Sequence, residues 1–65
     1  MTNEIRRERL TEPETAHYIG MSRPWLRLQR MRGTGPAFIK IGRAVRYDIR
    51  DLDRWLELHR VETRI

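Results

Sequence analysis

Three arginines near the middle of the chain have a spacing that would allow their side chains to bind one ligand together. Arg23, Arg27 and Arg30 follow one another at intervals of four and three residues. Residues three and four apart are neighbours on a helix, so this spacing predicts that the three guanidinium groups share one face. A solvated face usually mixes the two signs of charge, whereas this stretch contains no acidic residue. The arginine stripe (Arg23, Arg27 and Arg30) therefore favours contact with a polyanion.

The charge distribution of the whole chain supports the same interpretation. The 65 residues carry a net charge of +5, and every acidic residue falls in 4–14 or 48–62. The segment 15–47 has no acid, and its basic residues are Arg23, Arg27, Arg30, Arg32, Lys40, Arg43 and Arg46. A basic middle between nearly neutral flanks predicts a polyanion-binding surface. Arginine suits this role because its planar fork matches phosphate groups and guanine edges.

Other chemistries find little support. The chain has no cysteine, its only serine is Ser22, and its two histidines, His17 and His59, lie far apart. Neither metal-ligand spacing nor a paired set of catalytic carboxylates is present, and the glycines of 33–36 do not join a strand to a helix. We expect no enzyme activity, no cofactor, no metal and no small-molecule substrate.

Two short helices are predicted to position the arginine stripe. Thr11 and Glu14 form a T-x-x-E capping box, Pro13 suits a first turn, and Gly20 ends a helix of about residues 12–19. Ser22 then caps a second helix that ends at about residue 32, before Gly33. Two helices joined by three residues form a helix-turn-helix unit.

Further candidates lie on the second helix. Ser22 and the free N–H groups at the helix start are expected to hold a phosphate as well as to cap. Trp25 is expected either to pack on the core or to lie against a sugar-phosphate backbone. Leu28 is expected either to face the core or to project outward, and in the outward position it would lie towards a thymine methyl group or a second protomer.

A β-hairpin is predicted after the helices. The arms 37–41 and 44–47 are rich in β-branched and aromatic residues, and Gly42-Arg43 reads as the two-residue turn. Lys40, Arg43 and Arg46 lie along this hairpin, with Arg43 at its tip. We expect Lys40 and Arg43 to contact phosphates or a minor groove. Arg46 is expected either to join them or to pair with Asp48 or Asp51.

A third helix is predicted from Asp48 to about residue 60, with an apolar stripe on one side. The fold class is therefore mainly α with one β-hairpin. We expect an N-terminal arm over 1–9, a domain over 10–60 and a tail over 61–65, without a signal peptide or membrane span, in the cytoplasm. The expected core comprises Leu10, Ala16, Ile19, Met21, Leu26, Phe38 or Ile39, Ile41, Val45, Tyr47, Leu52, Trp55 and Leu56.

Three blocks in this order resemble a known family. They are L-T-x-x-E-x-A-x-Y-I-G-M-S-R from Leu10, G-x-G-P-x-F-I-K-I-G-R-x-V-R-Y from Gly33, and D-L-D-x-W-L from Asp51. Together they resemble small excisionases and AlpA-type regulators, a compact winged helix-turn-helix group related to mercury-resistance-type regulators. Gln29 departs from this pattern, since relatives often have an apolar residue there.

The resemblance implies a role for each block. The helix begun by Ser22 would be the recognition helix in the major groove, and the hairpin would be the wing. Such proteins bind double-stranded DNA and control excision of a prophage or integrating element, together with further protomers and an integrase. A transcription regulator is the close alternative. A protein-interaction module that docks an integrase, or an RNA-binding module, remains as a rival.

Overall fold

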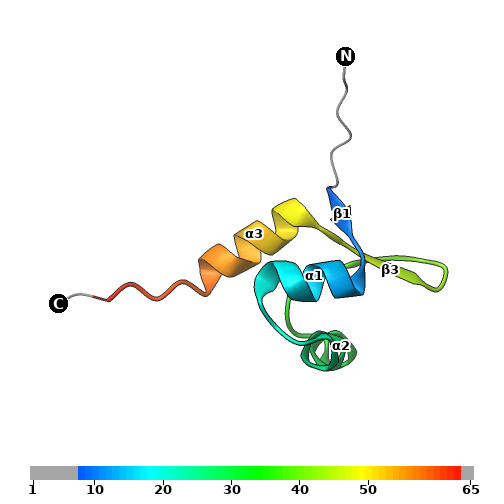
Figure 1. Cartoon of the computed structure of the whole chain (residues 1–65), viewed down its shortest axis with the longest axis horizontal. Helices are drawn as coiled ribbons and strands as arrows, with labels where there is room; N and C mark the ends of the chain where they lie inside the picture. The colour runs from blue at the N-terminus through cyan, green and yellow to red at the C-terminus, as the bar shows by residue number, and fades with distance from the viewer. Residues whose placement is uncertain (1–7, 64–65) are drawn as a thin grey trace, which may run out of the picture.

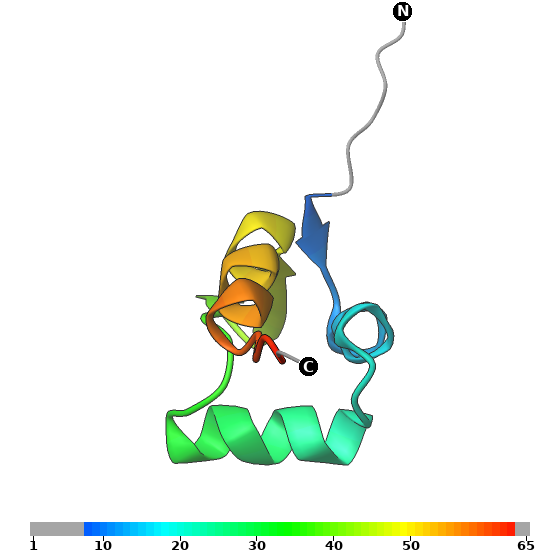
Figure 2. The same ribbon diagram turned by 90° about the vertical axis from the view of Figure 1, so that its left-hand side faces the viewer.

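The computed structural model of the chain describes residues 8–63. Along the chain the elements are β1 (Arg9–Leu10), α1 (Glu12–Ile19), α2 (Arg23–Arg32), β2 (Ile39–Ile41), β3 (Ala44–Asp48) and α3 (Ile49–Leu58). α2 crosses below α1 and α3, which stand next to each other, with the sheet at the start of α3 (Figure 1 and Figure 2). None of these helices is long and apolar enough to cross a membrane.

The first two helices begin and end where the capping residues predict. Both halves of the Thr11–Glu14 capping box form: the Thr11 hydroxyl accepts from the Glu14 backbone, and the Glu14 carboxylate accepts from the Thr11 backbone. Gly20 ends α1 with a φ of 76°, a left-handed conformation that favours glycine. The short turn leaves α2 running across α1 rather than beside it (Figure 2). The predicted helix-turn-helix is therefore confirmed.

The sheet has one strand more than the sequence predicts. The hairpin of β2 and β3 forms with Ile41 opposite Ala44, around the predicted Gly42-Arg43 turn. β1 then pairs with the other side of β3, with Leu10 opposite Tyr47, so that a three-stranded antiparallel sheet has the order β1-β3-β2. The expectation of a single hairpin is wrong in this respect. Two residues give too little alternation to reveal a strand.

β1 also changes the expected boundary of the N-terminal arm. Arg9 pairs with Asp48, and the Glu8 carbonyl accepts a hydrogen bond of 2.7 Å from the Ile49 backbone. The arm predicted over 1–9 thus ends in backbone that belongs to the sheet. Residues 1–7 lie outside the described part, as do residues 64–65 of the predicted tail.

The third helix follows β3 directly. The Asp48 carboxylate caps it by accepting from the Arg50 backbone at 2.8 Å, as predicted. The helix ends at Leu58, two residues before the expected end. A side-chain hydrogen bond joins α3 to α1: the Tyr18 hydroxyl donates to the Asp53 carboxylate at 2.5 Å.

A small core holds these elements together. Its buried apolar residues, all predicted, are Leu10, Ala16, Leu26, Tyr47 and Leu52. Two other predicted core residues are instead exposed, Met21 by 40% and Ile41 by 62%. Of the alternatives Phe38 and Ile39, Phe38 is 39% exposed and Ile39 is partly buried. Ile41 is the last residue of β2, next to the hairpin turn, where no helix covers it. Thr15, which was not predicted, is fully buried.

Candidate nucleic-acid interface

The arginine stripe has an acidic partner that the linear sequence conceals. All three guanidinium groups contact the carboxylate of Glu12, the first residue of α1, at 3.4 Å for Arg23, 2.8 Å for Arg27 and 3.3 Å for Arg30. The expectation that these arginines have no acid partner is therefore wrong. The crossing of α1 and α2 places Glu12 beside residues that follow it by 11 to 18 positions.

The surroundings of Glu12 strongly favour the ionised form of its side-chain carboxyl group. The Glu12 side chain is only 12% exposed, while those of Arg23 and Arg27 are more than half exposed. Hydrogen bonds from Arg27, then from Arg30, lower the pKa of Glu12 to about 2, although partial burial acts in the opposite direction. The same ion pairs raise the pKa of Arg27, led by its hydrogen bond to Glu12.

This low pKa predicts how acid should affect folding. The ordinary value is 4.5, so the unfolded chain takes up a proton at a pH where the folded chain does not. Glu12 thus contributes stability that is fully present above about pH 5 and is lost as the pH falls towards 2. Glu12→Gln should lower the free energy of unfolding by about 2 kcal/mol at pH 7.

Urea unfolding of both proteins between pH 2 and pH 7 measures this difference. The gap between wild type and Glu12→Gln should close as the pH falls. A gap of constant size across this range would show that the Glu12 charge does not stabilise the fold.

Arg30 differs from the other two arginines because it lies mostly inside. Its side chain is 19% exposed, and its Nη1 donates both to Glu12 and to the Tyr47 hydroxyl, at 3.1 Å. Its guanidinium carbon also lies 5.9 Å from the centre of the Phe38 ring. Arg30 therefore links α2 to α1 and β3, and little of it is left for a ligand.

The open face of α2 combines two residues of the stripe, Arg23 and Arg27, with apolar side chains. An open hollow runs along it, lined by Arg23, Pro24, Arg27, Leu28 and Met31. Leu28 is 41% exposed and Met31 is 76% exposed, so apolar side chains form much of this face. Of the two placements considered for Leu28, the structure has the outward one. Arg27 reaches the same face from the margin next to α1.

Trp25 points to the other side of α2. Its ring packs on the edge of the core and lies 6.1 Å from the Trp55 ring of α3. Of the two roles expected for Trp25, the structure places it in the packing role. Gln29, the residue that departs from the family pattern, is half-buried, and its side-chain oxygen accepts from the Thr34 hydroxyl.

The start of α2 is built as expected. Ser22 caps it, with its hydroxyl accepting from the Trp25 backbone at 3.2 Å. The side chain is exposed, so Ser22 stands at the surface beside Arg23 and the open face.

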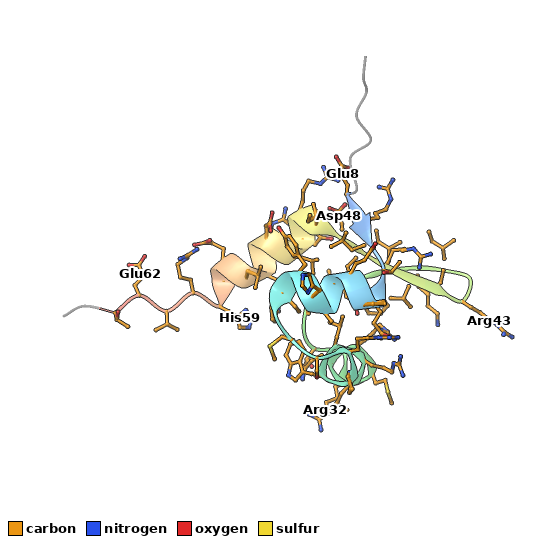
Figure 3. The ribbon with its side chains drawn as sticks, in the orientation of Figure 1. Glu8, Arg32, Arg43, Asp48, His59 and Glu62 are labelled. Carbon is orange, nitrogen blue, oxygen red and sulfur yellow. The ribbon has the colours of Figure 1, made fainter. Side chains whose placement is uncertain are left out.

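The wing adds basic groups without nearby acids. Within residues 8–63, no ion pair holds Lys40 or Arg43. Arg43 extends from the wing tip away from the body, and the labelled acids Glu8 and Asp48 lie elsewhere (Figure 3). Arg46 is half-buried and its Nη1 donates to the Val45 carbonyl at 2.9 Å, rather than to Asp48 or Asp51 as one expectation had it.

A second hollow joins the wing to α2. Its lining residues are Arg30, Met31, Phe38, Lys40, Gly42, Arg43 and Val45. Met31 lines this hollow as well as the one along α2. The two hollows are therefore neighbours, and together they form a surface from Arg23 to Arg43, which we call the α2–wing surface. Met31 could not be recognised from the sequence as part of this surface, because an exposed methionine has no pattern of its own.

The comparison with protein families agrees with this geometry. The model of a helix-turn-helix domain family, which includes excisionase-like proteins, matches residues 9–60. A search of curated proteins finds no match for the chain. A helix-turn-helix domain implies DNA as a partner, and such domains are typically not enzymes. From β1 through the last turn of α3, the chain belongs to this helix-turn-helix domain family.

Proposed function

We propose that the protein binds double-stranded DNA in a sequence-specific manner through the α2–wing surface. The observation that carries the proposal is the continuity of this surface: basic groups lie at both ends, with the apolar Leu28 and Met31 between them. Phosphates attract the basic ends, while apolar side chains can contact thymine methyl groups in a major groove.

Each part of the surface has a separate role in this proposal. α2 enters the major groove, with Arg27 directed at a guanine edge and Leu28 at a thymine methyl group. Ser22 and Arg23 contact a phosphate near the start of α2. Lys40 and Arg43 contact the backbone beside the groove. Arg30, Arg46 and Trp25 support the surface from behind, because their side chains are engaged within the fold.

The size of the surface bears on stoichiometry. A single small module buries only about 600–1,000 Å² of protein surface on DNA, which favours modest affinity. We propose that two or more protomers occupy adjacent sites. Excision control of a prophage or integrating element, together with an integrase, fits this arrangement and the resemblance of the sequence. Regulation of transcription is the alternative, because the same contacts serve both.

The wing provides the first test. Arg43→Ala should weaken binding to every duplex by a similar factor, about three- to tenfold at low salt, because a phosphate contact carries no sequence information. Fluorescence anisotropy with unrelated duplexes measures this effect. Arg60→Ala removes the same charge from the exposed end of the chain beyond α3 and is the matched control. A loss confined to one duplex would contradict the assignment of Arg43 as an anchor.

Competition separates double-stranded DNA from the two other ligand classes. Unlabelled duplex should displace the labelled duplex at far lower concentration than a structured RNA does. Stronger displacement by the RNA would favour an RNA-binding module. Absence of any duplex binding at low salt, together with binding to an integrase, would favour a protein-docking module.

A further inference from the structure

The contact between α1 and α2 brings one carboxylate to the edge of the proposed DNA-reading helix. Glu12 lies against the margin of α2 and its two oxygens are divided among three arginines. A single carboxylate facing three guanidinium groups leaves a net positive charge there. Glu12 therefore does not neutralise the positive charge of this surface. Its effect is on the direction in which the arginine side chains point.

The donor atoms of Arg27 show what this control achieves. Its Nε donates to one oxygen of Glu12 at 3.3 Å, and its Nη2 donates to the other at 2.8 Å. Guanidinium has five N–H groups, so this pair of bonds leaves three of them, on Nη1 and Nη2. In the described part of the chain, no hydrogen bond is made by Nη1 of Arg27. These remaining groups form the outer fork, the geometry that a guanine edge accepts.

Exposure alone would leave Arg27 free to move. Its side chain is 54% exposed, and a long unrestrained arginine can turn to the nearest phosphate as easily as to a base. Two hydrogen bonds to a carboxylate that is itself held by Arg23 and Arg30 remove most of this freedom. A contact group that neighbouring hydrogen bonds already hold in place discriminates better because less conformational entropy is lost on binding.

We infer that Glu12 is a positioning residue for base recognition. It fixes Arg27 with its outer fork towards the DNA and withholds it from the phosphates, so that Glu12 sets the preference for one sequence over others without touching DNA. This inference rests on the proposed function, because it requires that the α2–wing surface bind DNA.

The experiment uses a duplex selected by the wild-type protein from a randomised pool, together with a scrambled duplex of equal length. The variants are Glu12→Gln, Arg27→Ala and the double variant. Glu57→Gln is the matched control, because it removes an acid that also pairs with an arginine, Arg60, on the exposed side of α3. Circular dichroism at the assay temperature gives the folded fraction by which each affinity is corrected.

The expected result is a change in the ratio of the two affinities. Glu12→Gln should reduce the preference for the selected duplex about five- to tenfold, with the affinity for the scrambled duplex unchanged or raised. Glu57→Gln should leave the preference unchanged. In the Arg27→Ala background, Glu12→Gln should have no further effect on the preference, because the residue through which it acts is gone.

Two other outcomes would overturn the inference and are distinguishable. If the wild type binds DNA but Glu12→Gln keeps the wild-type preference, or lowers it equally without Arg27, Glu12 has only a structural role. If the wild type binds no duplex, the proposed function fails and the inference fails with it.

Discussion

Leu26→Ala should leave a large part of the protein unfolded at 25 °C. Leu26 has no exposed surface and anchors α2 in a core of only a few buried residues. Truncating a fully buried leucine costs about 3 kcal/mol, and a domain of this size has only about 3–5 kcal/mol in total. Thermal unfolding followed by circular dichroism should show a midpoint lower by roughly 15 °C. DNA binding should fall with the folded fraction.

Leu28→Ala is the matched control, since it removes the same atoms from the same helix. Leu28 is 41% exposed on the open face, so its loss should change stability by no more than about 0.5 kcal/mol. It should instead weaken binding to duplexes in which a thymine methyl group lies opposite it. Equal unfolding midpoints for the two variants would contradict the division of α2 into a buried and a DNA-facing side.

Arg27→Ala should have the largest effect on sequence preference among the substitutions on the α2–wing surface. A bidentate contact between arginine and guanine contributes about 1–3 kcal/mol of discrimination, which is roughly five- to 150-fold. The variant should lose this factor for a selected duplex and lose much less for a scrambled one. Glu12 keeps Arg23 and Arg30 as partners, so the fold should remain intact.

Arg54→Ala is the control for this variant. Arg54 is exposed on α3, where it pairs with Asp51, and its removal changes the net charge by the same amount. It should leave the sequence preference unchanged. If Arg27→Ala weakens the selected and scrambled duplexes equally, Arg27 is an anchor for phosphate and base recognition lies elsewhere on α2.

Local signals predicted the helices and the hairpin well. Thr11, Gly20 and Ser22 act within a few residues of themselves, so their effect on the backbone is visible in the linear sequence. The Gly42 turn is similar, because a two-residue loop with a positive φ at Gly42 determines the pairing of its own arms. These signals place α2 and the β2–β3 hairpin in the chain before any tertiary contact is known.

Features that depend on tertiary contact were missed or misassigned. The ion pairs of Glu12 require the crossing of α1 and α2, and the burial of Thr15 depends on what packs against that side of α1. The Thr15 hydroxyl even lacks a hydrogen-bond partner among residues 8–63, an unfavourable position for a polar group. The helical periodicity correctly predicted that the three arginines of the stripe lie together. It could not show that the stripe lies next to α1, or that Leu28 and Met31 lie on the open face of α2.

The dependence of duplex affinity on salt tests the central claim most directly. Each phosphate neutralised by a basic group contributes about −0.9 to the slope of log affinity against log salt concentration. With Arg23, Lys40 and Arg43 as anchors, the account predicts a slope of about −3 per bound protomer, shallower by about one for Arg43→Ala. A flat slope, or no binding to any duplex at low salt, would contradict the proposal that the α2–wing surface binds DNA.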